Sequence, residues 1–147
     1  MTETDAAAPA VSPPLPQVND RNRFYWDAVQ AHELQLLRCQ ACGHYVHYPR
    51  PICDRCQSWD LAPEQISGRA TLYSFCVVMQ ASHPWFADKI PYIIGVVEVD
   101  EEPGVLMPTG IVDCTEDELR CGIPMEVVFR AVTDDFTLPY FRPAAGR

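Results

Sequence analysis

The sequence predicts a mainly β protein, in which an N-terminal helix leads into a small metal-binding lobe and then into a five-stranded barrel. Two Cys-x-x-Cys pairs lie ten residues apart, and from Gly68 onward short runs rich in β-branched and aromatic residues alternate with turns. We expect an arm over residues 1–18, the helix and a short strand over 19–37, the metal-binding lobe over 38–60, the barrel over 61–143 and a tail over 144–147.

The composition of the 147-residue chain limits the function classes that suit it. Its 20 acidic and 11 basic residues give a formal net charge of -9, which repels phosphate backbones, so we expect no nucleic-acid partner. No apolar run reaches the roughly 18 residues that a membrane-spanning helix needs. Seven cysteines, four of them in two tight pairs, favour a metal site in the reducing cytoplasm over a disulfide framework.

Residues 1–18 contain four prolines, four alanines and no lysine or arginine. A secretory signal needs a positively charged start and an unbroken apolar run, and this segment has neither. The composition predicts a flexible, partly polyproline arm. A segment that becomes ordered against a partner is the alternative.

The first regular element is predicted to be a helix over residues 20–31, followed by a short strand at 34–38. Phe24, Tyr25 and Trp26 are consecutive, so they cannot all face one side of a helix. The helix therefore has more apolar surface than one buried stripe. Phe24 and Trp26 either pack on the following domain or dock on another protein, and the sequence leaves both possibilities open.

Cys39, Cys42, Cys53 and Cys56 are the predicted metal ligands. Two residues between cysteines allow a turn to direct both sulfurs to one point, and two such turns place four sulfurs at about 2.3 Å from a tetrahedral Zn²⁺. Four thiolates fill the coordination shell, so this zinc is expected to be structural. Iron is the alternative metal for four thiolates.

The segment between and around the cysteine pairs carries histidines and arginines. Because the set of four cysteines is complete, His44 and His47 are expected to be surface or hairpin residues. Arg38, Arg50 and Arg55 make the lobe locally positive. They either balance the doubly negative Zn(Cys)₄ centre, which we favour, or bind a phosphate-bearing ligand.

The barrel prediction depends on five strand-like runs after a polar linker at residues 58–67. Three runs precede a short helix and two follow it, which is the order of an OB-fold barrel, although the same pattern could form another small β-barrel. The runs are RATLYSFCVVMQ, PYIIGVVEVD, VLMPTGIVD, PMEVVFRAV and residues 137–142, and a Thr115–Glu118 capping box predicts the helix at 116–121.

No catalytic set can be recognised in the sequence. Cys76, Cys114 and Cys121 have no readable Cys–His arrangement, so we expect small buried apolar side chains at these positions. Trp85 and Phe86 lie on the loop between the first two barrel strands, and a loop cannot easily bury both. They either cover the barrel mouth or meet a partner or an acyl chain.

Several segments together resemble the family named domain of unknown function thirty-five. They are FYWDAV, RCQACG, YPRPICDRC, SGRATLYS, PYIIGVVEVD, CGIPMEVVF and the FRP at Phe141 to Pro143. The resemblance covers about residues 20–143 and implies a helix, a rubredoxin-like zinc ribbon and a C-terminal OB-fold. The sequence differs from the family pattern at Ala70 and His32, and it lacks the usual proline after Cys53. These differences affect turns and leave the metal ligands intact.

The resemblance implies a non-catalytic accessory subunit of a thiolase-like acyl-CoA enzyme, an aldolase or acyltransferase of lipid, steroid side-chain or polyketide metabolism. Such a chain joins a hetero-oligomer and helps to form the acyl-CoA channel, while the catalytic residues belong to the partner. The candidate partner or acyl-CoA contacts are Phe24, Trp26, Arg50, Trp85 and Phe86. A stand-alone acyl-CoA-binding module and a nucleic-acid-binding OB-fold are the alternatives.

Overall fold

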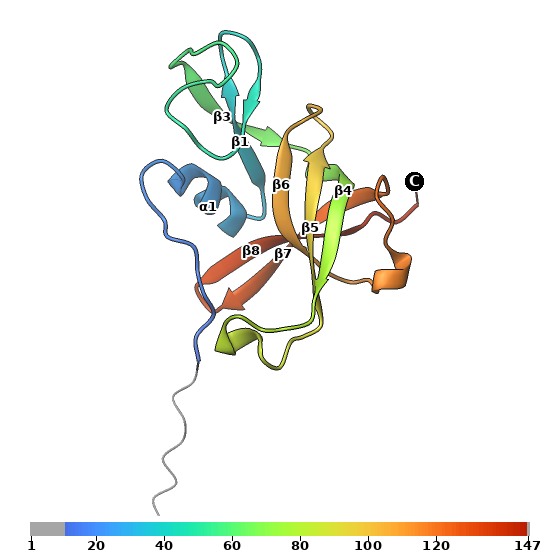
Figure 1. The fold of residues 1–147 in the computed structure, drawn as a ribbon. Helices are drawn as coiled ribbons and strands as arrows, with labels where there is room; N and C mark the ends of the chain where they lie inside the picture. The colour runs from blue at the N-terminus through green and yellow to red at the C-terminus, as the bar shows by residue number, and fades with distance from the viewer. Residues whose placement is uncertain (1–10, 147) are drawn as a thin grey trace, which may run out of the picture.

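The structure is a computed structural model that describes residues 11–146. Figure 1 shows a small lobe built on β1–β3 above a β-barrel, with α1 beside both. The elements are α1 (Arg23–Gln30), β1 (Leu34–Cys39), β2 (Tyr45–Val46), β3 (Leu61–Ile66), β4 (Arg69–Val78), the 3₁₀ turn η1 (Pro84–Phe86), β5 (Tyr92–Val99), β6 (Leu106–Ile111), the 3₁₀ turn η2 (Glu116–Glu118), β7 (Pro124–Thr133) and β8 (Phe136–Pro143).

The predicted N-terminal arm lies partly outside the described residues. Residues 1–10 are not described, and residues 11–18 form neither helix nor strand. Val11 and Leu15 in this segment have exposed side chains. The chain enters α1 from this arm, along the left of Figure 1.

Helix α1 packs one face on the barrel and the small lobe. Tyr25 is buried, and Phe24 and Trp26 are half-buried against the main core, which accounts for the apolar excess that the sequence shows. The Gln30 side chain exchanges two hydrogen bonds with the backbone of Thr137 in β8: its amide donates at 3.2 Å and its oxygen accepts at 2.9 Å. Packing and hydrogen bonding together therefore fix the helix on the barrel.

Three antiparallel strands in the order β2-β1-β3 form the sheet of the small lobe. β3 pairs with β1 along its whole length, from Leu34 opposite Ile66 to Cys39 opposite Leu61. The prediction of a polar linker over residues 58–67 is therefore wrong for β3. Its sequence, LAPEQI, contains a proline and two polar residues and resembles a loop, but the pairing with β1 makes it a strand. The sheet of the small lobe thus extends beyond residue 60, the predicted end of this lobe.

The remaining strands close a barrel in the order β4-β5-β6-β8-β7. β7 returns to pair with β4, and β6 meets β8 through a single parallel pair, Ile111 with Phe141. This order, with η2 between the third and fourth barrel strands, is that of an OB-fold and confirms the prediction. The Thr115–Glu118 capping box is present, but it starts one 3₁₀ turn instead of the predicted helix over 116–121.

One apolar core joins the barrel, the small lobe and the helix. Leu72, Val97 and Phe141 fill the barrel interior, and Leu36 of β1 and Val29 of α1 belong to the same buried cluster. Among the residues described, none with a polar or charged side chain is fully buried. Because the core is continuous, burial of apolar surface holds the small lobe against the barrel.

The cysteines outside the two pairs differ from expectation. Cys76 and Cys121 are exposed and Cys114 is half-buried, so the prediction of three buried side chains is wrong. Cys76 lies opposite the exposed Ile94 on the outer side of the barrel, and Cys121 lies in the turn before β7. Strand alternation places every second residue outside, which an apolar run alone does not reveal. Within residues 11–146, no helix is long and apolar enough to cross a membrane.

Candidate functional site

Two equivalent turns carry the four paired cysteines. After the first pair, the Gly43 N–H donates to the Cys39 carbonyl at 2.8 Å; after the second, the Gln57 N–H donates to the Cys53 carbonyl at 3.0 Å. The residue that closes each turn has a left-handed backbone conformation, with φ of 76° at Gly43 and 62° at Gln57. Glycine adopts this conformation without a steric penalty, whereas glutamine accepts some strain.

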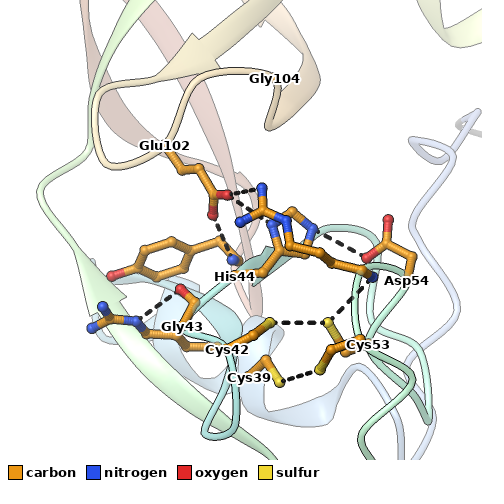
Figure 2. A network of polar contacts seen from close by, with 12 residues as sticks. Cys39, Cys42, Gly43, His44, Cys53, Asp54, Glu102 and Gly104 are labelled. Carbon is orange, nitrogen blue, oxygen red and sulfur yellow. Dashed lines mark hydrogen bonds and ion pairs between the residues drawn. The ribbon is translucent and has the colours of Figure 1, made fainter.

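The turns bring the four sulfurs together, as Figure 2 shows. All four atoms lie within 4.8 Å of one another. Cys39 Sγ is 3.5 Å from Cys56 Sγ, and Cys42 Sγ is 3.7 Å from Cys53 Sγ. Four ligands at about 2.3 Å from a tetrahedral ion stand about 3.8 Å apart, so the geometry fits a Zn²⁺ with a complete thiolate shell.

One side of the cysteine cluster is buried and the other is exposed to solvent. Cys39 and Cys53 are buried in a small apolar cluster with Val46, while Cys42 and Cys56 are exposed. The backbone N–H of Arg55 points to Cys53 Sγ at 3.4 Å, which is the kind of hydrogen bond that stabilises a metal-bound thiolate. The inner pair thus anchors the cluster in the lobe.

Glu102, from the turn between β5 and β6, reaches across to the cysteine loops (Figure 2). Its carboxylate accepts from the backbone N–H of Tyr45 at 2.7 Å and from the guanidinium of Arg55 at 2.6 Å, and it lies 2.8 Å from His44 Nδ1. Burial alone would raise the pKa of Glu102, but these partners outweigh it and hold the pKa below the ordinary value. We call this set of contacts the Glu102 bridge, because it joins the barrel to the metal lobe.

His44 lies between two carboxylates. Its Nε2 is 3.1 Å from Asp54 Oδ1, while its Nδ1 faces Glu102. His44 lies in the hairpin loop between β1 and β2, as one half of the prediction has it, but its side chain is only 14% exposed. The sequence could not reveal this, because Glu102 is far away along the chain.

Arg38 supports the first cysteine turn from β1. Its Nε donates to the Gly43 carbonyl at 3.1 Å, and its Nη1 contacts both carboxylate oxygens of Glu64, at 2.8 and 3.1 Å. The Tyr45 hydroxyl donates to the same carboxylate at 2.6 Å. Burial, together with this carboxylate, raises the pKa of Tyr45 to about 12.

The other two arginines of the lobe also have carboxylate partners. Arg50 lies 3.7 Å from Asp54, and Arg55 belongs to the Glu102 bridge. All three arginines are therefore engaged in ion pairs within the protein. This arrangement weakens the interpretation of a phosphate-binding cluster.

His47, predicted to be a surface or hairpin residue, follows β2 directly and is half-buried. Its Nδ1 is buried and has no hydrogen-bond partner among the described residues, and its ring contacts Tyr48 at 4.3 Å between centroids. Burial, with a smaller effect from the charge of Arg50, lowers the pKa of His47 to about 4. The imidazole is therefore neutral near pH 7.

Two hollows lie along the barrel. The first, of 510 Å³, lies between the start of α1, residues 47–49 of the lobe and strands β6 and β8; the second, of 450 Å³, lies beside the Trp85 loop. Gly110 and Tyr140 line both hollows. Volumes of this size suit small-molecule ligands.

The predicted contact residues are spread over these surfaces. Trp26 lines the first hollow, and Trp85 and Phe86 line the second. Phe24 packs against the main core, and Arg50 lies on the metal lobe, so neither lines a hollow. Whether these five residues touch a partner remains a prediction.

Trp59, a residue without a predicted role, has a side chain that is 76% exposed on the small lobe. Tyr73 and Met79 on or beside β4 are exposed large side chains as well. A signal for Trp59 existed: it is a tryptophan in a polar segment just after Cys56, the last of the four paired cysteines. Strand alternation could have identified Tyr73 only with the register known, because a bulge interrupts β4 at this point.

A four-cysteine lobe packed on an OB-fold barrel defines a class of zinc-ribbon OB-fold proteins. Two family models match consecutive parts of the chain: the ChsH2 rubredoxin-like zinc ribbon domain over residues 26–62 and the ChsH2 C-terminal OB-fold domain over residues 63–130. With the relatives described next, these matches show that the chain belongs to the DUF35 family, which confirms the resemblance seen in the sequence.

The curated relatives include scaffold proteins and an enzyme subunit. A DUF35 domain-containing scaffold protein of Methanothermobacter thermautotrophicus is 31% identical over 72% of this chain and 78% of its own length. A similar scaffold protein of Methanocaldococcus jannaschii is 31% identical over 67% of this chain and 69% of its own length. The probable enoyl-CoA hydratase alpha subunit of Thermomonospora curvata is 32% identical over 97% of this chain, but the chain spans only 44% of that relative's length.

Two solved structures of DUF35 proteins have a similar fold. A chain of the Ltp2-ChsH2(DUF35) aldolase superposes with a TM-score of 0.78 and 32% sequence identity, covering 88% of this chain and 98% of that one. A DUF35 protein of Sulfolobus solfataricus superposes with a TM-score of 0.58 over 85% of this chain and 86% of its own. At 9% identity, the second match supports the fold alone.

Proposed function

We propose that this chain is a non-catalytic accessory subunit that binds a thiolase-like acyl-CoA enzyme and helps to form its acyl-CoA channel. The observation that carries the proposal is the similarity to nearly the whole of one chain from the Ltp2-ChsH2(DUF35) aldolase, at 32% identity. Relatives named scaffold proteins support the accessory role. The thiolase-like class of the partner follows from the family resemblance.

In this proposal Cys39, Cys42, Cys53 and Cys56 hold a structural Zn²⁺. The complete thiolate shell leaves no position for water or substrate, so the ion would supply folding energy and no chemistry. The contacts of the Glu102 bridge then hold the metal loops in a fixed position against the barrel. We propose a location in the reducing cytoplasm, where cysteines that form no disulfide are stable.

The partner surface is proposed to include the aromatic side chains beside the two hollows. Trp85 and Phe86 meet edge to face at 4.8 Å on a loop, and both remain partly exposed. Aromatic side chains of this kind are enriched at the centres of protein interfaces. Phe24, Trp26 and Arg50 stay in the proposal as rim contacts.

A stand-alone acyl-CoA-binding module is a weaker proposal. In such a module Arg38, Arg50 and Arg55 would have to hold the phosphate-bearing end of the CoA, and each of them already pairs with a carboxylate. Freeing an arginine from such a pair would offset part of the gain from a bound phosphate.

The experiment is co-purification with a thiolase-like enzyme encoded in the same genome. Size-exclusion chromatography with light scattering should give one complex that contains both chains, and its mass would give the stoichiometry. A thiolase-like enzyme from an unrelated pathway serves as the control and should elute separately. Separate elution of the cognate pair, without any change in the enzyme's activity, would overturn the proposal.

A further inference from the structure

Strand β4 is paired along one side but only partly along the other. On the first side β4 pairs with β5 from Ala70 to Val78. On the second side β7 pairs only with Arg69–Thr71, and Leu72 exchanges backbone hydrogen bonds with the turn before β7. Beyond Leu72, this side of β4 makes no backbone hydrogen bond to any other residue within 11–146. We call this unpaired side of residues 73–78 the β4 edge.

The β4 edge lacks the features that usually protect an unpaired strand. Alternate residues of an edge strand direct their N–H and C=O groups away from the sheet, and this row is a template for a further strand. Charged side chains and prolines normally prevent such pairing. Strand β3, at the edge of the small sheet, has both in Pro63 and Glu64. The β4 edge has neither, and no Asp, Glu, Lys or Arg occurs between Ala70 and Ala87.

The side chains along the β4 edge are exposed and largely apolar. Tyr73 is 58% exposed, and Met79, directly after the strand, is 70% exposed. Cys76 is exposed between them in the sequence, and it pairs across to the exposed Ile94 of β5. Exposed apolar residues that lie together in this way mark interaction surfaces.

The charge of the chain favours a second copy of the same chain as the occupant of this edge. With a formal net charge of -9, two copies repel each other over most of their surfaces. Residues 70–87 have no charged side chain, so two copies can approach there without an encounter of like charges. An antiparallel pair of identical edges is also self-complementary, because the same row of groups donates and accepts on both chains.

We infer that two copies of this chain form a dimer through the β4 edge, in which the two barrels share one antiparallel sheet. The two-fold axis lies near Cys76, in the middle of the edge. The contact uses backbone groups that belong neither to the cysteine cluster nor to the two hollows. The inference goes beyond the proposed accessory role, and because it concerns the chain without an enzyme partner, either one can fail without the other.

The first test is the mass of the full zinc-loaded chain, measured by size-exclusion chromatography with light scattering and by analytical ultracentrifugation over a range of concentrations. The wild-type chain should have the mass of two copies. Ser74→Lys adds a charge at an exposed position of the edge, where it would face its own copy. This variant should raise the dissociation constant of the dimer by about tenfold.

Gln65→Lys is the matched control for Ser74→Lys. Gln65 is an exposed strand residue as well, but it lies on β3, whose edge already carries a proline and a carboxylate. The added lysine should therefore leave the dimer unchanged. Circular dichroism shows whether Ser74→Lys is folded, and the cysteine variants described next decide the question if it is not.

Cys76 gives an independent readout of where the two chains meet. In an antiparallel pair centred near this residue, the two Cys76 side chains lie on one face of the shared sheet, within reach of a short bis-maleimide cross-linker. The wild-type chain should give a covalent dimer with this reagent. Cys121→Ser should give it too, whereas Cys76→Ser should not. The two variants are matched, because both cysteines are exposed and lie outside the metal cluster.

Four outcomes would overturn the inference. The first is a wild-type chain with the mass of one copy at every concentration. The second is an equal effect of Ser74→Lys and Gln65→Lys on the dimer. The third is a covalent dimer that persists in Cys76→Ser and is lost in Cys121→Ser, which would move the contact to the turn before β7. The fourth is a Ser74→Lys chain that stays dimeric but no longer binds the thiolase-like enzyme, which would assign the edge to that enzyme.

Discussion

At the scale of single residues, His47 gives the stability of the protein a defined pH dependence. Its pKa is about 4 in the folded chain and near 6.5 in an unfolded one. Between these values the unfolded chain binds more protons, so stability should fall as the pH drops from about 6.5 to 4, by on the order of 3 kcal/mol in total. Urea unfolding of the wild-type chain and of His47→Gln across this pH range measures the loss of stability.

The quantity to compare is the difference in unfolding free energy between the wild-type chain and His47→Gln at each pH. Acid also protonates the cysteines and releases metal, but it does so in both proteins. The wild-type chain should lose more stability on acidification than His47→Gln. Parallel pH profiles would mean that His47 does not stay neutral in the fold.

Trp85 is the residue on which the proposed interface depends most. Its ring is packed by Phe86 and Lys89 within its own loop and makes no contact with the barrel core cluster. Trp85→Ala should therefore weaken binding of the thiolase-like partner, by about 2 kcal/mol or more if it is a hot spot, with little loss of monomer stability. Calorimetric titration and thermal unfolding of the same variant measure the two effects.

Trp59→Ala is the matched control for Trp85→Ala. Trp59 is the most exposed large apolar side chain described, and it lies on the other lobe. A larger binding loss from Trp59→Ala would move the interface to the metal lobe. A large stability loss from Trp85→Ala would return Trp85 to a structural role.

At the scale of elements, the two cysteine turns should depend on a metal for their fold. Their apolar cluster is small, so a missing ligand cannot be offset by packing. Cys42→Ser should lower the zinc content measured by mass spectrometry and reduce the melting temperature and solubility. Cys76→Ser, an exposed cysteine outside the cluster, should change neither. Unchanged metal content in Cys42→Ser would refute the ligand assignment.

The Glu102 bridge is the second feature that links elements, and its contribution to stability can be measured. Glu102→Gln keeps the shape but removes the charge that faces His44 and Arg55, so unfolding should become easier by about 1–3 kcal/mol. Glu116→Gln, on the exposed turn η2, should have no effect. Chemical denaturation of both variants provides the measurement, and equal stabilities would show that the bridge contributes nothing.

The pH dependence of this bridge has a definite sign. The pKa of Glu102 is lowered in the folded chain, so its contribution is present above the ordinary value of 4.5 and is lost as the pH falls below that value through the folded pKa. The Glu102→Gln variant should lack this acid-sensitive part. The bridge acts below the range in which His47 first responds.

Local signals in the sequence predicted these elements unevenly. The cysteine spacing predicted the metal cluster, because the motif is complete within a single short segment. Strand β3 was missed, because Pro63 and Glu64 disfavour a strand and only the pairing with β1 makes it one. The roles of His44 and His47 were missed for the same reason: their surroundings come from elements distant in sequence.

At the scale of the whole molecule, the continuous core makes the helix, the metal lobe and the barrel one unit. Leu36 and Ile66 of the small lobe share a buried cluster with Val97 and Phe141 of the barrel. The barrel order was predictable because three strands, a short helix and two strands follow one another in an OB-fold. The two hollows were not predictable, because they form where residues from α1, the lobe and the barrel meet.

The central claim is that this chain supplies shape and contact surface while a partner performs the chemistry. The most direct measurement is turnover of an acyl-CoA substrate by the purified chain, by the thiolase-like partner and by the two together. The account predicts no turnover by this chain alone and higher activity of the pair than of the partner alone. Turnover by this chain alone, free of contaminating enzyme, would contradict it.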